Sequence, residues 1–247
     1  MQTRYRKSPT DYDCMLKYFL ICVALAVAAP PLRAESAPSE VDAPRFEAEV
    51  GLFAIEDEIF PPNACATLFV GSSSIRFWFT LARDFPSLKI IRRGFGGSKI
   101  ADVLYYFDRI VTPYHPRAIV FYAGENDIHD GMTPEDVFAS FKKFMQKKDL
   151  ELGETPVYFI SIKPSIARIA DLSAQTVANG KIAEFAATRS DLVFIDVASA
   201  MMDGEAPKNI FIADDLHMNA DGYSIWRAIV GDALAGKTPA AQAPYCS

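Results

Sequence analysis

Five short runs of apolar and β-branched residues recur along the chain, and the segments between them place apolar residues three and four positions apart. The runs occupy residues 67–71, 88–94, 117–124, 156–163 and 192–197. Helical spacing occupies residues 46–60, 74–84, 99–111, 134–148, 172–188 and 220–235. Because the runs are apolar on both faces and alternate with helices, the pattern predicts an α/β fold in three layers, with a five-stranded parallel sheet between two layers of helices.

Large apolar side chains in the predicted helices are expected to pack in the hydrophobic core. Trp78 and Trp226 lie at core spacing, and we expect both to be buried. The segment 99–111 carries an apolar stripe that also predicts core packing, formed by Ile100, Val103, Leu104, Phe107 and Ile110.

The first 34 residues have the pattern of an export signal. Basic residues lead into the apolar run Tyr18–Ala29, which is too short to span a bilayer and is followed by a cleavage-like segment ending at Ala34. An uncleaved amphipathic anchor is the alternative. We expect a signal peptide at 1–34, a disordered linker at 35–44 and one domain at 45–247, exported to the bacterial periplasm or secreted, without a stable membrane anchor after cleavage.

The net charge argues against a nucleic-acid site, and the spacing of cysteine and histidine residues argues against a metal site. The signal region holds five basic and two acidic residues, so its removal changes the formal net charge from −6 to −9. Such an acidic chain, with scattered basic residues, argues against nucleic-acid binding. No group of cysteine and histidine residues has the spacing of a metal site, so we expect no metal.

Polar residues follow the predicted strands where a parallel sheet gathers its ligands, at the carboxyl ends of the strands. The first strand is followed by Gly71-Ser72-Ser73-Ser74, and the second by Gly94-Phe95-Gly96-Gly97-Ser98. The third strand is followed by Gly124-Glu125-Asn126-Asp127. The last helix is preceded by Asp214 and His217. Each segment alone is typical of a turn or a helix cap. Together they supply a hydroxyl nucleophile, a base, a carboxylate and oxyanion donors, the parts that ester hydrolysis needs.

Three histidines compete for the role of base. His115 precedes the third strand and therefore lies at the amino end of the sheet. His129 follows the third strand but has only the adjacent Asp127 and Asp130 beside it. His217 has Asp214 three residues before it, so we favour His217, with His129 as the second candidate.

Two other enzyme signatures are absent from the sequence. No Gly-x-Ser-x-Gly motif exists, which argues against the ordinary α/β-hydrolase arrangement. The segment Gly94–Lys99 follows a strand, but Lys99 stands where a dinucleotide site needs its third glycine.

The four blocks together resemble the SGNH hydrolases, the GDSL esterase/lipase superfamily. The blocks LFVGSSSIRFW, RGFGGS, YAGENDI and DDLHMNADGY follow the family's order and span 71–223; they resemble a bacterial branch in which Gly-Ser-Ser-Ser replaces Gly-Asp-Ser-Leu. With the strand–helix alternation, the resemblance implies a flavodoxin-like sheet of strand order 2-1-3-4-5.

The resemblance also implies a role for each matching residue. Ser73 is the nucleophile and its N–H an oxyanion donor; Gly97 supplies a second N–H, and Asn126 a side-chain donor. Asp214 and His217 are the acid and base. Ser72 replaces an aspartate outside the catalytic set, so we expect Ser72 to shape the turn and Ser74 to start the helix. All these groups belong to the protein, so we expect no organic cofactor.

The implied activity is that of a serine esterase on small acyl esters, acetyl above all, carried by a small molecule or a glycan. A lysophospholipase or acyl-thioesterase is the alternative, although no long apolar lid is evident. A non-catalytic carbohydrate-binding relative is a further alternative that the complete set of blocks argues against. Arg93 and Arg168, at strand ends, could bind substrate but are commonly solvated.

The two cysteines outside the signal region are predicted to pair. Cys65 lies just before the first strand, at the amino end of the sheet. The last helix starts at the opposite end and runs antiparallel to the strands, so Cys246 after it returns to the amino end. In an oxidising compartment these positions favour a disulfide.

Overall fold

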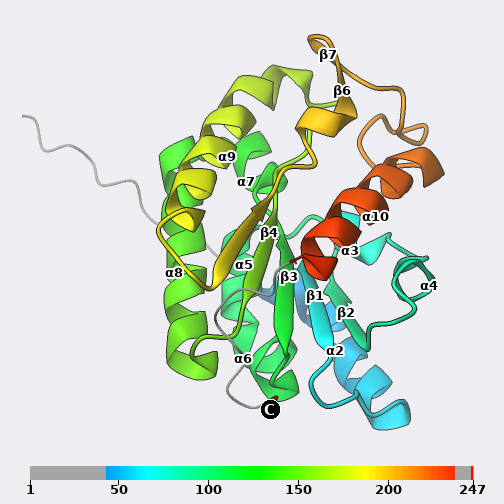
Figure 1. Ribbon diagram of the computed structural model, residues 1–247, viewed down its shortest axis with the longest axis vertical. Helices are drawn as coiled ribbons and strands as arrows, with labels where there is room; N and C mark the ends of the chain where they lie inside the picture. Colours follow the sequence, from blue (N-terminus) through cyan, green and yellow to red (C-terminus); the bar gives the residue numbers. More distant parts are fainter. Residues whose placement is uncertain (1–42, 237–245, 247) are drawn as a thin grey trace, which may run out of the picture. The chain divides into compact units, whose positions relative to one another are not determined.

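The computed structural model describes residues 43–236 and 246, and the account below concerns these residues alone (Figure 1). The predicted signal peptide and residues 35–42 of the predicted linker lie outside the described residues. The first described helix, α2 (Ala43–Ile59), begins two residues inside the predicted linker. Among the described residues, no helix is long and apolar enough to cross a membrane.

A five-stranded sheet lies at the centre of the domain, and all its neighbouring strands are parallel. Its order is β2-β1-β3-β4-β5, as predicted. The strands are β1 (Thr67–Gly71), β2 (Ile90–Gly94), β3 (Ala118–Tyr122), β4 (Val157–Ile160) and β5 (Leu192–Ile195). A small antiparallel pair, β6 (Met202–Asp203) and β7 (Ala206–Pro207), lies outside the sheet.

Helices cover both faces of the sheet, which confirms the three-layer α/β prediction (Figure 1). One layer contains α5 (Ile100–Tyr105), α6 (Phe107–Ile110), α8 (Pro134–Leu152) and α9 (Leu172–Ala186), with α2 packed on the same core. The other contains α3 (Ser73–Arg76), α4 (Leu81–Asp84) and α10 (Ala220–Ala235). The connections include α7 (Glu125–His129) and the 3₁₀ turns η2 (Thr112–Tyr114), η3 (Ile169–Asp171) and η4 (Ser199–Met201).

Two hydrophobic cores separate the layers because strand side chains alternate between the faces. In β1, Leu68 and Val70 enter the core beneath α8 and α9, whereas Phe69 enters the core beneath α10. The strand β3 alternates in the same way. Trp78 and Trp226 are fully buried in the α10 core, their rings 5.7 Å apart, so both tryptophans pack as predicted.

Two of the predicted helices are each divided in the structure. The segment 74–84 forms α3 and α4, separated by a turn in which Trp78 Nε1 and Thr80 Oγ1 both donate to Asp84 Oδ2, at 2.7 and 2.5 Å. The segment 99–111 forms α5 and α6, which meet at Tyr106, where ψ is 6°. Apolar spacing predicted the buried faces but not these local breaks.

Arg93 serves the fold. Arg93 is only 3% exposed. Its guanidinium donates to the Tyr114 hydroxyl at 2.7 Å and to the Glu56 carboxylate at 3.1 Å, and it forms an ion pair with Asp57. Glu56 and Asp57 belong to α2, so Arg93 ties that helix to β2. The substrate contact considered for Arg93 is therefore wrong.

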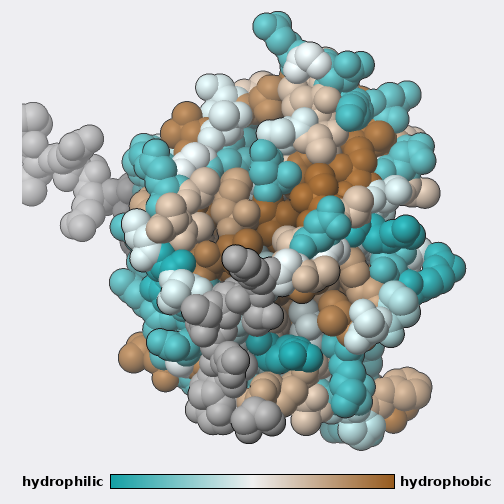
Figure 2. Space-filling model, viewed as in Figure 1, coloured by the Kyte–Doolittle hydropathy of each residue, from teal (hydrophilic) through white to brown (hydrophobic). Residues whose placement is uncertain are grey.

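Apolar side chains also reach the surface at the β5 edge of the sheet. Figure 2 shows them as a band over the face where β5 and α10 lie. The half-buried side chains of Val193 in β5 and of Ile225 and Ile229 in α10 pack against the core beneath α10. These side chains continue the core out to the edge strand, which has a partner on one side only.

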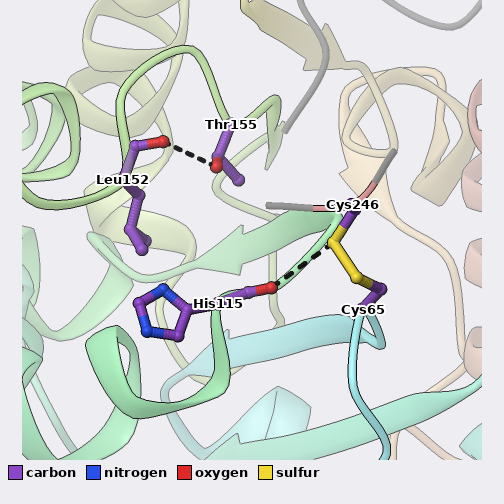
Figure 3. Close-up of a disulfide and its surroundings, with 5 residues drawn as sticks. All are labelled: Cys65, His115, Leu152, Thr155 and Cys246. Carbon is purple, nitrogen blue, oxygen red and sulfur yellow. Dashed lines mark hydrogen bonds between the residues drawn. A yellow bond between two sulfur atoms is a disulfide. The ribbon is translucent and has the colours of Figure 1, made fainter. Parts of the chain in front are cut away.

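Cys65 and Cys246 form a disulfide, as predicted (Figure 3). Cys65 lies two residues before β1, and Cys246 follows the last helix, so the bond closes a loop across the amino end of the sheet with a sequence separation of 181. The Cys246 sulfur lies 3.6 Å from the carbonyl oxygen of His115, which places this histidine at the same end of the sheet.

We expect Cys65→Ser to lower the free energy of unfolding by about 2–5 kcal/mol, the usual cost of losing a native disulfide, because the open chain regains loop entropy when unfolded. Urea denaturation of exported protein measures this, with Cys246→Ser as the matched variant. Both variants should unfold at the same midpoint and keep the wild-type kcat. Two titratable thiols in the denatured, unreduced wild type would contradict the pairing.

Candidate active site

The turn after β1 presents one serine of the three. Gly71 has φ of +140°, and a Cβ there would lie 1.8 Å from the Tyr122 carbonyl oxygen, so β1 can approach β3 this closely only through a glycine. Ser72 and Ser74 are each 2% exposed, whereas Ser73 is half-buried. Only Ser73 is thus accessible enough to attack a substrate.

The neighbours of Ser73 have structural contacts. Ser72 occupies the N-cap position of α3 without a side-chain cap bond, and its N–H donates to the Tyr122 carbonyl at 2.9 Å. The helix begins at Ser73, one residue earlier than predicted from Ser74. The Ser74 carbonyl accepts a hydrogen bond from the Tyr223 hydroxyl at 2.9 Å, which anchors the turn to α10.

His217 reaches Ser73 across 144 positions of sequence. Its Nε2 lies 3.0 Å from Ser73 Oγ, and its Nδ1 lies 2.5 Å from Asp214 Oδ2. An ionised carboxylate only accepts hydrogen bonds, so Nδ1 carries the ring proton and Nε2 presents a lone pair to the serine hydroxyl. The ring of Phe77 packs edge-on against the imidazole, with centroids 4.8 Å apart. This geometry is that of a serine–histidine–aspartate triad.

Asp214 divides its two oxygens between the local turn and the triad. Oδ1 accepts the N–H groups of Leu216 and His217 at 3.0 and 2.9 Å, while Oδ2 binds the imidazole. Partial burial raises the pKa of Asp214, but the hydrogen bonds from His217 and Leu216 outweigh it and lower the pKa to about 2. The carboxylate therefore stays charged beside the imidazole at any working pH.

The loop that carries the acid and the base is closed at its neck. Phe211 and Met218 form an antiparallel bridge, and the Ile212 N–H donates to the His217 carbonyl at 2.8 Å. Asn219 then caps α10 by accepting the N–H groups of Asp221 and Gly222. The bridge before Asp214 and the cap after His217 therefore hold the acid and the base in a short loop directly before α10.

The loop after β2 lies against the turn after β1. The Phe95 N–H donates to the Gly71 carbonyl at 3.0 Å, and Gly97 adopts φ of +75°, a left-handed conformation that favours glycine. The Ser98 carbonyl accepts from Asn126 Nδ2 at 2.9 Å. The structure therefore gathers the three predicted oxyanion segments, around Ser73, Gly97 and Asn126, at one end of the sheet.

The hydrogen-bond partners of Asn126 determine the orientation of its side-chain amide. Nδ2 donates to the Ser98 carbonyl, and Oδ1 accepts from Arg168 NH1 at 3.0 Å. A flipped amide would set oxygen against oxygen at Ser98 and N–H against a cation at Arg168. One N–H of Nδ2 is used at Ser98, which leaves the other for an oxyanion.

Asp127, the next residue, ties the Asn126 turn to the start of α5. Both of its oxygens lie within hydrogen-bond distance of the Ile100 N–H, at 3.1 and 3.4 Å, and the side chain is fully buried. Since Ile100 follows Gly97 by three residues, this contact fixes two of the oxyanion segments relative to each other.

The other two histidines lie elsewhere. His115 is at the amino end of the sheet beside the disulfide, as its position in the sequence predicted. His129 pairs with Asp171 at 2.9 Å and is half exposed. The second candidate for the base is therefore wrong, because His129 is engaged by another carboxylate while His217 contacts Ser73.

Sequence reasoning missed a buried ionic group below the site. Glu125 is 4% exposed, and it accepts from the Tyr122 hydroxyl at 2.7 Å and from Lys163 Nζ at 3.0 Å. Lys163 also donates to the Leu216 carbonyl at 2.8 Å, next to His217. A lysine at the end of an apolar strand and a glutamate inside the third block were the available signals, since neither residue type is buried without a partner.

A cavity of about 550 Å³ opens beside His217. Apolar side chains dominate its wall, which comprises Phe77, Phe79, Ile212, Met218, Ala220 and Tyr223, with Thr80, Asp84, Asn219, Ser224 and Arg227 among them. Phe79 is 75% and Ile212 50% exposed. Its size falls in the range of pockets that bury drug-sized ligands, about 300–1,000 Å³.

Within the described residues, no group of three or more histidine, cysteine, aspartate or glutamate side chains is placed to hold a metal ion. The groups at this end of the sheet are a hydroxyl, an imidazole, a carboxylate and N–H donors. They can add a serine hydroxyl to a carbonyl carbon and stabilise the resulting oxyanion.

The sequence profile of the GDSL-like lipase/acylhydrolase family matches residues 71–225, from the glycine before the serine turn to the first helical turns after His217. The matched range contains all four blocks and both residues of the acid–base pair. No curated protein sequence matches the chain.

Solved structures share the fold at low sequence identity. A protein from Streptococcus pneumonia superposes with a TM-score of 0.69 at 19% identity, over 78% of this chain and 94% of that one. A GDSL-like lipase from Bacteroides thetaiotaomicron gives 0.65 at 20% identity, over 76% and 98%. An acetylxylan esterase from Geobacillus stearothermophilus gives 0.55 at 11% identity, over 68% and 93%.

Stability should depend on pH through Asp127. Burial raises the pKa of Asp127 from 3.8 to about 7, although the Ile100 N–H acts to lower it. A raised folded-state pKa favours the neutral carboxyl, so its contribution to stability is complete below pH 3.8 and is lost as the pH rises to 7. Asp127→Asn keeps an oxygen for Ile100 but cannot ionise.

We therefore expect the free energy of unfolding of the wild type to fall relative to Asp127→Asn between pH 4.5 and 7, by at most about 1.4 kcal/mol per pH unit, and then to level off. Urea denaturation of both proteins at four pH values measures the difference. A difference that stays constant across this range would contradict the assignment.

Proposed function

Because this chain belongs to the GDSL-like lipase/acylhydrolase family and is an ester hydrolase, we propose that it cleaves carboxylic esters through an acyl-enzyme on Ser73. The observation that carries the proposal is the line of contacts from Asp214 to His217 at 2.5 Å and from His217 to Ser73 at 3.0 Å. It joins an accessible serine hydroxyl to a base of defined tautomer.

In this mechanism His217 Nε2 takes the proton from Ser73 as Oγ adds to the ester carbonyl. The N–H groups of Ser73 and Gly97 and the Asn126 amide stabilise the oxyanion. His217 then returns the proton to the departing alcohol, and activates the water that releases the acid from Ser73. Asp214 holds the imidazole and stabilises its charged form.

Two acyl groups are candidates. The acetyl ester of a glycan is the expectation from the sequence, and the shared fold of the Geobacillus acetylxylan esterase is compatible with it. The cavity beside His217 supports an apolar acyl chain of medium length, because its volume and its aromatic wall exceed what an acetyl group can use. Burial of a methylene contributes about 0.8 kcal/mol, so the cavity favours the longer chain.

Export remains part of the proposal. The disulfide between Cys65 and Cys246 supports an oxidising compartment, since such bonds are rare in reducing cytosol. The segment that would direct export, residues 1–34, lies outside the described residues. Amino-terminal sequencing of the mature protein, expected to begin at Glu35, checks it.

We expect Ser73→Ala and His217→Ala each to remove nearly all hydrolysis of p-nitrophenyl acetate, while circular dichroism shows an unchanged fold. Asn126→Ala should raise the activation free energy by about 3 kcal/mol, the usual effect of losing one oxyanion donor. Ser72→Ala is the matched control beside the nucleophile and should keep most of kcat. A fully active Ser73→Ala would refute the assignment of the nucleophile.

The acyl group is tested with p-nitrophenyl esters from acetyl to palmitoyl, which vary the acyl chain and keep the alcohol constant. We expect kcat/KM to rise about tenfold for two methylenes beyond acetyl, because they enter the cavity. Ser224→Trp, on the cavity wall, should remove this gain and spare the acetate; Ser224→Ala is its control. Equal effects of Ser224→Trp on all chain lengths would show that the cavity holds another group.

A further inference from the structure

Arg168 contacts the Asn126 amide from the side opposite Ser98. Its NH1 donates to Asn126 Oδ1 at 3.0 Å, and its side chain is 12% exposed. A guanidinium has five N–H donors and no acceptor, so it can face only the oxygen of the amide. Arg168 thereby selects the amide orientation that directs Nδ2 away from it.

A buried carboxylate holds Arg168 in place. Glu125 Oε1 lies 3.7 Å from Arg168 NH1, and the same oxygen accepts from Lys163 Nζ at 3.0 Å. Burial, together with the charge of Glu125, raises the pKa of Tyr122 well above its usual value, so the Tyr122 hydroxyl stays protonated and donates to Glu125 Oε2. Both oxygens of Glu125 are thus committed, and the cation faces a fixed negative charge.

The same group and the Arg168 segment contact residues next to each member of the triad. The Tyr122 carbonyl accepts from the Ser72 N–H at 2.9 Å, one residue from the nucleophile, and Lys163 donates to the Leu216 carbonyl, one residue from the base. The backbone of the Arg168 segment joins the loop of the acid, since the Ala167 N–H donates to the Asp215 carbonyl at 3.0 Å. Arg168 is the member of this group that contacts an oxyanion donor.

We propose that Arg168 is a positioning residue that, held by Glu125, orients and polarises the Asn126 amide so that one N–H of Nδ2 faces the oxyanion. The inference rests on the proposed function, since an oriented amide matters only if an oxyanion forms. A guanidinium on the amide oxygen also draws electron density from the amide nitrogen, which makes its N–H a stronger donor.

The test is a double-mutant cycle of Arg168→Leu and Asn126→Ala, with kcat and KM measured on a p-nitrophenyl ester. We expect Arg168→Leu to lower kcat and kcat/KM together by about tenfold, less than Asn126→Ala, with KM unchanged, because Ser98 still binds the amide. In the Asn126→Ala background, Arg168→Leu should change kcat less than twofold, because the group through which it acts is gone. Arg168→Lys keeps a donor and should recover most of the loss.

A matched control separates this role from a structural one. Arg189 forms ion pairs with Asp149 and Asp191 at 2.7 Å at the amino end of β5, so Arg189→Leu should lower the melting temperature and leave kcat unchanged. Arg168→Leu should lower kcat even at temperatures where both variants are fully folded.

Four results would overturn the proposal. A higher KM with unchanged kcat would assign Arg168 to substrate binding, and a loss that adds fully to that of Asn126→Ala would assign it to the fold. Unchanged kinetics of Arg168→Leu, in an enzyme that Ser73→Ala inactivates, would refute the positioning role and leave the proposed function intact. A fully active Ser73→Ala would refute the proposed function, and the positioning role with it.

Discussion

The strands β1, β2 and β3 end at one level, and the positions of Ser73, Gly97 and Asn126 depend on this alignment. In the register of the sheet, Gly71 pairs with Gly94 on one side and with Tyr122 on the other. Three polypeptide segments therefore turn away from the sheet at one place. A side chain at Gly71 would collide with the Tyr122 carbonyl oxygen, so the serine turn can lie against β3 only because this residue lacks a Cβ.

Backbone hydrogen bonds then convert this alignment into a defined site. The Gly71 carbonyl accepts from Phe95, the Ser98 carbonyl from Asn126, and the Ile100 N–H donates to Asp127. The first contact joins the loop after β2 to the end of β1, and the other two join it to the loop after β3. The proposed oxyanion donors thus come from backbone and short side chains whose freedom has been removed before substrate binds, which is the condition for strong oxyanion stabilisation.

Beneath these loops, the buried group of Glu125, Lys163 and Tyr122 is a costly arrangement. A charge in an apolar interior loses several kcal/mol of hydration, which its partner offsets only with good geometry. Burial lowers the pKa of Lys163, and the attraction of Glu125 opposes this change. An apolar replacement could serve the core as well, so the polar group is better explained by its contacts with Ser72, Leu216 and Arg168 than by stability.

Local sequence determined the strands, the helix faces and the identity of Ser73, Gly97, Asn126, Asp214 and His217 as candidates. These depend on apolar periodicity, on turn residues and on a pattern of blocks, all of which are written in short stretches of chain. The disulfide was predicted from sheet direction together with an oxidising compartment, because the directions of the strands and of the last helix bring both cysteines to the amino end of the sheet.

Only the tertiary structure decided what lies between those stretches. It excluded His129 by pairing it with Asp171 and made Arg93 a partner of α2. It also formed the cavity from side chains of the turn between α3 and α4, of α4, of α10 and of the 211–219 loop. It also brought Arg168 to Asn126, 42 positions apart in sequence. Such contacts join side chains from different elements, and their distances depend on the packing of whole layers, which no local pattern of residues encodes.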